Sequence, residues 1–345
     1  MHELVNGLAH LCSLRDRDAL DHALVALLVQ TGQGRVDKVR LLRVLGDADD
    51  LHCLTRAERQ YGVPESERRA GWLDWPDLPA LSAQPALVQA HRSGKLVQLA
   101  GTPCLTVLPL GNGPACMNLL EFSSAQPLSD DIFGTLQGIA RLYQNFEGLL
   151  DYGEKDALTE LLNRKTFDGA FAKAAIQHVA PQTEQPADRR VMPSEEGFWL
   201  AVLDIDFFKR VNDNYGHLIG DEVLLLMARL MRAHFRFQDQ LYRFGGEEFV
   251  ILMRCANPLD AAGALERFRT TVEAYEFPQV GKITVSIGFA ALRDDDTPGG
   301  AFDRADKAVY YAKGHGRNQV RSYQSLIDAG ELSEESDDAN EIDFF

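Results

Sequence analysis

The C-terminal half of the sequence contains two mostly apolar segments that are separated by a very short connection. Residues 241–244 and 249–252 have the aliphatic and aromatic composition of buried strands, and Gly245, Gly246, Glu247 and Glu248 lie between them. A connection this short makes the two strands antiparallel neighbours, and its glycines can adopt the positive φ angles of tight turns. The segment predicts a hairpin with two carboxylates at its tip. By itself, this pattern is equally typical of an ordinary surface turn.

A third apolar segment ends in a carboxylate. Residues 200–203 are apolar and run directly into Asp204, which places this side chain at the carboxyl end of a predicted core strand. If this strand and the hairpin are neighbours, Asp204 and Glu247 converge on one point. Two carboxylates and a backbone carbonyl, with phosphates and water completing the shell, form a usual Mg²⁺ site for nucleotide chemistry.

Several separated motifs of the C-terminal half resemble the GGDEF family of diguanylate cyclases and occur in the family's order. They lie within residues 156–164, 204–209, 212–221, 243–249, 286–288 and 305–318. The resemblance covers about residues 155–322. It implies a palm-like domain with a central, mainly antiparallel sheet flanked by helices. It also implies condensation of two GTP molecules into cyclic di-GMP and two pyrophosphates by a homodimer, with Mg²⁺ as cofactor and Mn²⁺ as a substitute.

The resemblance also implies roles for individual residues. Asp204, Glu247 and the Ile205 carbonyl would hold the metal, and Asp204, Glu247, Glu248 and Lys209 would form the catalytic set. The implied GTP-binding residues are Phe207, Phe208, Lys209, Asn212, Asp221, Lys313 and Arg317. Asn212 and Asp221 would hydrogen-bond the guanine edge. An aspartate can accept hydrogen bonds from the N1 and N2 donors of guanine, which adenine lacks, so GTP is favoured over ATP.

Three further residues match the inhibitory product site of the family. Arg236 and Asp239 have the family's spacing before the hairpin, and Arg267 matches an additional arginine of that site. The resemblance implies inhibition by cyclic di-GMP, whereas an arginine and an aspartate three residues apart also form simple ion pairs at helix ends. One position departs from the family: Glu160 stands where glycine is common, so the local turn is expected to differ.

Two other functions compete with the cyclase. A catalytically silent GGDEF-type domain could serve as a receptor for cyclic di-GMP or GTP, but such domains usually lose the acids or the hairpin glycines that are present here. A cyclase acting within one ATP molecule shares the palm-like fold, but Asn212 and Asp221 favour guanine.

The first 128 residues alternate between helix and strand patterns. Helical spacing extends to Val29, strands are expected at 40–45, 51–54, 96–100, 104–110 and 115–122, and a short helix is expected at 86–91. Residues 93–95 before a strand, an apolar run containing Pro109, and residues 127–129 resemble the GAF family of small-ligand sensory domains. A PAS-like domain is the alternative. The sequence identifies neither the signal nor whether it activates or represses.

A heptad pattern follows this domain. Apolar side chains recur at alternating spacings of three and four, at Ile132, Leu136, Ile139, Tyr143, Phe146 and Leu150. The pattern predicts a parallel coiled coil that joins two copies of the chain, or one amphipathic helix that covers a domain core. We therefore expect a sensory and dimerisation domain over 1–128, a signalling helix over 129–155, a GGDEF domain over 156–325 with a flexible insertion at 180–197, and an acidic tail over 326–345.

Composition excludes some partners. The net charge of −16 disfavours nucleic acid, because binding a polyphosphate strand requires a basic surface. Apolar stretches such as residues 23–29 are too short to span a membrane, and the first residues lack a signal-peptide pattern, which predicts a cytoplasmic location. The five cysteines lack CxxC spacing and are expected to be reduced thiols.

Overall fold

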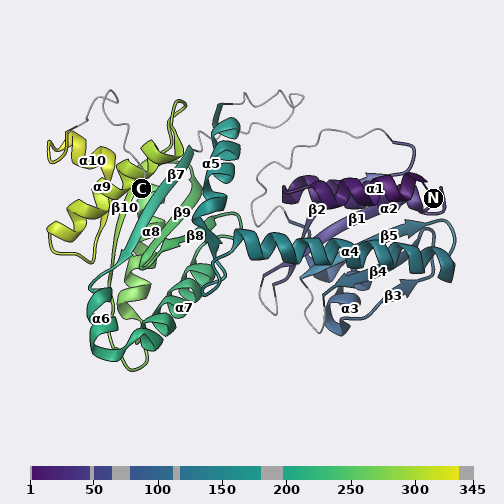
Figure 1. Ribbon diagram of the computed structural model, residues 1–345, viewed down its shortest axis with the longest axis horizontal. Helices are drawn as coiled ribbons and strands as arrows, with labels where there is room; N and C mark the ends of the chain where they lie inside the picture. Colours follow the sequence, from purple (N-terminus) through teal and green to yellow (C-terminus); the bar gives the residue numbers. More distant parts are fainter. Residues whose placement is uncertain (1, 47–49, 64–77, 112–116, 180–196, 334–345) are drawn as a thin grey trace. The chain divides into compact units, whose positions relative to one another are not determined.

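A computed structural model of the chain describes residues 2–46, 50–63, 78–111, 117–179 and 197–333. Contacts divide the chain into two compact units, residues 1–153 and 154–345. Each unit is built around one β-sheet with helices against it (Figure 1). The predicted insertion lies outside the described residues except for Gly197, which begins a strand. None of the helices in the described ranges is both long and apolar enough to cross a membrane.

The N-terminal unit contains an antiparallel sheet in the order β2-β1-β5-β4-β3. Its elements are α1 (His2–Ser13), α2 (Arg17–Thr31), β1 (Lys38–Leu45), β2 (His52–Gln60), η2 (Leu81–Ala83), α3 (Pro85–Ser93), β3 (Val97–Leu99), β4 (Cys104–Leu110), β5 (Asn118–Ser124) and α4 (Asp130–Glu154). Strand β2 is longer than expected because its second half alternates polar residues with the buried Ala57. The GAF-like or PAS-like type of this unit stays a prediction.

Successive residues of a strand point to opposite faces, and this sheet buries both of its faces. One face, with Leu41 and Phe122, packs on α1, α2 and α4. The other face, with Leu42 and Leu119, packs on α3.

The heptad stripe of α4 is buried within its own unit. Leu136, Ile139 and Tyr143 are at most 3% exposed and belong to the core shared with α1, α2 and the sheet. The other three stripe residues are partly buried against the same core. The expected coiled coil along this stripe is therefore not confirmed, and in this structure α4 is an amphipathic helix that covers the core of its own unit. Heptad spacing determines which helix face is apolar, but it does not determine which surface covers that face.

The C-terminal unit contains a six-stranded sheet in the order β11-β10-β7-β9-β8-β6. Its elements are β6 (Leu162–Asn163), α5 (Arg164–Val179), β7 (Gly197–Ile205), α6 (Phe208–Tyr215), α7 (His217–His234), β8 (Gln240–Gly245), β9 (Glu248–Cys255), α8 (Pro258–Ala274), β10 (Val285–Ala291), α9 (Pro298–Gly314), β11 (Val320–Ser322) and α10 (Tyr323–Asp328). The central pairs β10–β7, β7–β9 and β9–β8 are antiparallel, and the short edge strands β6 and β11 are parallel to their neighbours. The predicted mainly antiparallel sheet flanked by helices is confirmed.

Helices α7 and α8 cover one face of this sheet, and α9 lies against β10. The packing of α9 is unusually close because Gly288 has no side chain. A Cβ at this position would lie 2.2 Å from the Ala305 carbonyl oxygen and 2.4 Å from the Val309 nitrogen. The glycine therefore determines how near the polar residues of α9 come to the sheet.

Two local features bear on the expected tail and on the turn at Glu160. Helix α10 continues to Asp328, beyond the expected start of the tail at residue 326, and residues 334–345 lie outside the described part. Glu160 has a φ of 57°, the left-handed conformation that glycine adopts without strain. The turn therefore has a backbone conformation typical of glycine although the residue is glutamate.

Candidate active site

The carboxyl end of β7 and the hairpin between β8 and β9 lie side by side. Asp204 is the register partner of Glu248, the first residue of β9. The turn before it contains Gly245 and Gly246, with φ values of 154° and 50° that only glycine adopts easily. Strand pairing thus brings the acids of the turn to the end of the neighbouring central strand, as the sequence predicted.

A lysine and a further carboxylate from α9 join these acids. The Lys313 ammonium lies 2.7 Å from Asp204 Oδ2. Burial raises the pKa of Asp204, and the Lys313 hydrogen bond and charge oppose that rise. Asp306, whose own pKa burial raises, adds to the field at Glu248. Asp306 lies within the 305–318 motif, but neither the residue pattern nor the resemblance predicted a role for it.

The hairpin acids are destabilised as anions by this arrangement. Partial burial, followed by the charge of Asp204, raises the pKa of Glu247 and also that of Glu248, which remains exposed to solvent. Such mutual repulsion means that a cation at this point would stabilise all the carboxylates at once.

The donor set therefore fits a divalent cation that shares its ligands with a substrate. In the described ranges, no three His, Cys, Asp or Glu side chains form a ready-made metal cage. A hard cation such as Mg²⁺ commonly takes one or two protein carboxylates and completes its shell with water and phosphate oxygens. Asp204 and Glu247 would hold it here, together with the carbonyl of Ile205, the last residue of β7.

The hairpin turn is anchored to the first residues of the C-terminal unit. Arg243 donates from Nε and Nη2 to the Gly246 carbonyl at 3.2 and 2.9 Å, and from Nη1 to Asp156 Oδ1 at 2.9 Å. The same Asp156 oxygen accepts from the backbone and hydroxyl of Thr159. These bonds couple the position of the acidic turn to the segment that follows α4 in the chain.

The predicted guanine-binding residues lie on α6 and α7. Asn212 is half-buried on α6, and Asp221 is exposed in the first turns of α7, directly after Gly220. A Cβ on Gly220 would lie 2.0 Å from Asn212 Oδ1, so the Asn212 carboxamide occupies the space that the missing side chain leaves. The structure thus brings Asn212 beside the residue that precedes Asp221.

The predicted phosphate-binding residues surround the start of α6. Phe207 caps this helix with a left-handed φ of 60° and is 47% exposed, whereas Phe208 is buried in the core. The guanidinium carbons of Arg210 and Arg317 each lie 4.4 Å from the centroid of the Phe207 ring. Lys209 is exposed in the first helical turn. A helix N-terminus with such cations suits an anionic group. Arg210 was not among the predicted phosphate-binding residues, although it directly follows Lys209.

The residues of the predicted inhibitory site lie around the end of α7. The Asp239 carboxylate accepts from the Arg236 backbone nitrogen at 2.9 Å, which closes a tight turn before β8. Burial raises the pKa of Asp239 to about 6. Burial lowers the pKa of His234 in α7, and the charge of Arg267 contributes to that decrease. Arg267 therefore lies near the end of the helix that leads to Arg236.

A mainly antiparallel sheet with acidic residues at the ends of two central strands defines the C-terminal unit as a palm-like domain. The family model described as "Diguanylate cyclase, GGDEF domain" matches residues 154–319. This match identifies residues 154–319 as a GGDEF domain.

Several known proteins are similar to this chain. Diguanylate cyclase DgcP of Pseudomonas aeruginosa is 35% identical over 198 residues, which covers 56% of this chain and 28% of that protein. Diguanylate cyclase DgcM of Escherichia coli is 38% identical over 166 residues, covering 48% and 37%. The GGDEF domain of DgcB from Caulobacter crescentus, solved in complex with c-di-GMP, is 32% identical with a TM-score of 0.43, covering 50% of this chain and 96% of that one. The chain spans well under half the length of the two curated relatives.

Proposed function

We propose that this protein is a diguanylate cyclase that condenses two GTP molecules into cyclic di-GMP and two pyrophosphates. The observation that carries the proposal is the cluster of Asp204, Glu247 and Glu248 beside Lys313. Burial and mutual repulsion raise the pKa of these carboxyl groups, so a bound divalent cation would stabilise their charged forms. The family match over residues 154–319 supports it.

In this proposal the protein mainly positions and neutralises its substrate. Asn212 and Asp221 bind the guanine edge, and Lys209, Lys313, Arg317 and the amides of Phe207 and Phe208 bind the triphosphate. Glu247, with Glu248 beside it, assists removal of the proton from the attacking 3′-hydroxyl. A bound Mg²⁺ would polarise the α-phosphate and lower the pKa of that hydroxyl.

Incubation of the purified protein with GTP and Mg²⁺, followed by chromatography, tests this function. Cyclic di-GMP should form, and Asp204→Asn and Glu247→Gln should each abolish turnover while the melting temperature changes little. Glu276→Gln is a matched control, because Glu276 is exposed and pairs only loosely with Lys282 at 3.6 Å. Wild-type protein that binds cyclic di-GMP tightly but makes none would instead be a receptor.

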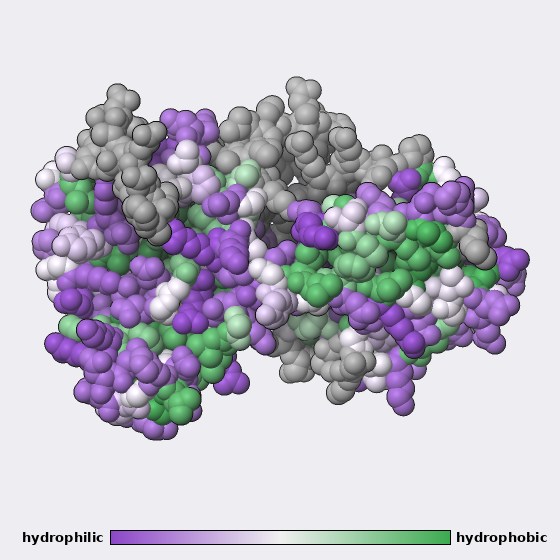
Figure 2. Space-filling model, viewed as in Figure 1, coloured by the Kyte–Doolittle hydropathy of each residue, from purple (hydrophilic) through white to green (hydrophobic). Residues whose placement is uncertain are grey.

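We further propose that the active form is a homodimer, because each domain binds one GTP and the reaction needs two. The buried stripe of α4 is occupied by its own core, so another surface has to serve. Leu142 and Leu149 of α4 are 38% and 64% exposed, and Val5 of α1 is 56% exposed. Figure 2 shows a hydrophobic patch where Figure 1 places α1 and α4.

Sedimentation of the full chain tests this surface. Leu149→Glu, combined with Leu142→Glu, should shift the protein to monomers and reduce the activity per molecule at low concentration. Leu259→Glu is a matched control, since Leu259 is 82% exposed on α8 of the other unit. A dimer that survives the double substitution would exclude α4 as the contact.

We also propose that product binding at Arg236, Asp239 and Arg267 inhibits the enzyme and that the N-terminal unit regulates it. Arg236→Ala should relieve inhibition by added cyclic di-GMP without lowering the initial rate. Unchanged inhibition would exclude this site. Melting-temperature shifts of the full chain in a small-molecule screen would identify a ligand of the N-terminal unit.

A further inference from the structure

The loop after α9 has an unusual backbone. Gly316, Arg317 and Asn318 have φ values of 108°, 61° and 46°, so three consecutive residues are left-handed and two of them are not glycine. Side-chain-bearing residues adopt this conformation only where surrounding contacts impose it. Arg317 is one of the residues proposed to bind the triphosphate, so whatever holds the loop also places this cation.

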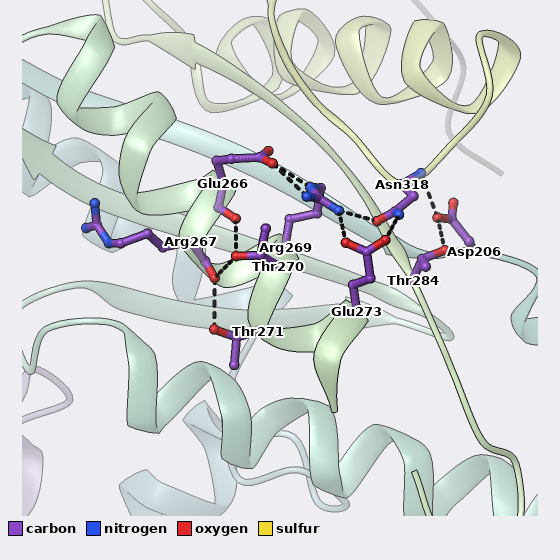
Figure 3. A network of polar contacts seen from close by, with 9 residues as sticks. All are labelled: Asp206, Glu266, Arg267, Arg269, Thr270, Thr271, Glu273, Thr284 and Asn318. Carbon is purple, nitrogen blue, oxygen red and sulfur yellow. Dashed lines mark hydrogen bonds and ion pairs between the residues drawn. The ribbon is translucent and has the colours of Figure 1, made fainter. Parts of the chain in front are cut away.

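Three hydrogen bonds hold Asn318. Its Oδ1 accepts from Arg269 Nη1 at 2.7 Å, its Nδ2 donates to Glu273 Oε1 at 2.8 Å, and its backbone nitrogen donates to Asp206 Oδ2 at 3.0 Å. Asparagine tolerates left-handed geometry better than most residues. These partners come from α8 and from the end of β7, and Figure 3 shows them converging on Asn318.

Asp206 is held in place on one side of this network by hydrogen bonds to its neighbours. Its side chain is buried, and its two oxygens also accept from the hydroxyls of Thr284 and Ser286, each at 2.7 Å. Its backbone nitrogen donates to the Thr284 carbonyl at 2.9 Å. Because Phe207 is the next residue, one carboxylate ties the 316–318 loop to the start of the proposed phosphate site.

Arg269 is held in place on the other side of the network by two glutamates. Glu266 and Glu273 accept hydrogen bonds from its guanidinium group at 2.7–2.8 Å. These bonds fix the orientation in which the guanidinium group donates to Asn318. The Arg269 hydrogen bond, followed by that of Asn318, lowers the pKa of Glu273. Figure 3 shows the Arg267 and Arg269 side chains pointing to different sides of α8, so Arg269 is separate from the proposed inhibitory site.

We infer that Arg269, Glu273 and Asp206 are positioning residues that, through Asn318, hold the 316–318 loop so that Arg317 is oriented for the triphosphate before GTP binds. In the structure the Arg317 guanidinium already lies over the Phe207 ring at 4.4 Å. Charges that are held in place before binding lose less entropy when the ligand arrives. The inference rests on the proposed function, since it concerns how the same site binds its substrate.

Binding of a non-hydrolysable GTP analogue and of guanosine, measured by calorimetry on the full chain, tests this inference. Asn318→Gly removes both side-chain bonds but keeps left-handed geometry accessible. It should lower the affinity for the analogue by about tenfold, which corresponds to the loss of one charge-assisted hydrogen bond from Arg317 to the triphosphate. The affinity for guanosine should not change. Arg269→Met should act similarly. Arg229→Met, at an exposed arginine of α7, is the matched control and should change neither affinity.

A double substitution separates positioning from general stability. In an Arg317→Ala background, Asn318→Gly should add less than about a twofold loss, because its effect passes through Arg317. Full additivity, an equal loss for guanosine, or wild-type affinity in a folded Asn318→Gly protein would overturn the inference. Wild-type protein that binds the analogue but makes no cyclic di-GMP would refute the proposed activity and leave the positioning measurement valid.

Discussion

The substitution Gly220→Ala should reduce the affinity for GTP without reducing the stability of the fold. Gly220 is a buried residue within α7, and a Cβ there would lie 2.0 Å from Asn212 Oδ1 and 3.1 Å from Asn212 Cγ. The nearest ring atom, Phe208 Cζ, would be 3.4 Å away, which is a normal contact. Gly220→Ala therefore collides with the movable end of one side chain, and Asn212 has to rotate away.

The two consequences have opposite signs. Alanine is favoured over glycine in a helix by up to about 1 kcal/mol, so the free energy of unfolding should be unchanged or slightly higher. If Asn212 binds guanine as proposed, the displaced carboxamide loses hydrogen bonds that are each worth about 0.5–1.5 kcal/mol. Losing one of them should decrease the affinity for GTP by about 2- to 13-fold. Discrimination against ATP should decrease as well.

Thermal unfolding and calorimetric titration with GTP and ATP analogues measure both effects. Asn212→Ala should lose a similar amount of GTP affinity, and Gly220→Ala added to it should cause little further loss. If Gly220→Ala binds the GTP analogue as tightly as the wild type, Asn212 does not read guanine from the position seen here. A large loss of stability would show that the backbone, rather than Asn212, absorbs the methyl group.

Three further changes test other parts of the structure. Glu160→Gly should relieve left-handed strain and raise the free energy of unfolding by about 0.5–1 kcal/mol, even after the extra chain entropy of glycine is subtracted, as denaturant titration would measure. Gly288→Ala should destabilise the domain by at least about 2 kcal/mol and reduce cyclase activity, because α9 carries Lys313 and the clash is with backbone; a wild-type melting temperature would contradict the packing. Burial raises the pKa of Asp239 to about 6, so its carboxylate form is lost as the pH decreases through that value. If this carboxylate binds the product, inhibition constants should increase between about pH 7.5 and about pH 5, and Asp239→Asn should remove that dependence. Because the folded state holds this proton more tightly than the unfolded state, ionisation of Asp239 also lowers stability as the pH rises from about 4 to about 6.

Local sequence patterns were sufficient to predict the hairpin of β8 and β9 and the neighbouring strand β7. The short glycine-containing connection leaves β8 and β9 no arrangement other than antiparallel pairing, and the apolar run before Asp204 marks a core strand. Their order in the sheet depends on hydrogen bonds between segments far apart in the chain. The register of Asp204 with Glu248 therefore became definite only in the folded unit.

Which surface or side chain each local pattern contacts became known from the folded structure alone. The heptad stripe of α4 is visible in the sequence, but the core of its own unit covers it, because burying an apolar stripe needs only a matching apolar surface. In the same way, Asp206 and Asn318 lie 112 residues apart, and nothing local to either indicates their hydrogen bond. Local runs of residues were thus enough to predict the chemistry proposed for the C-terminal domain. Long-range packing determined how its charged groups are oriented, because that depends on contacts between distant segments.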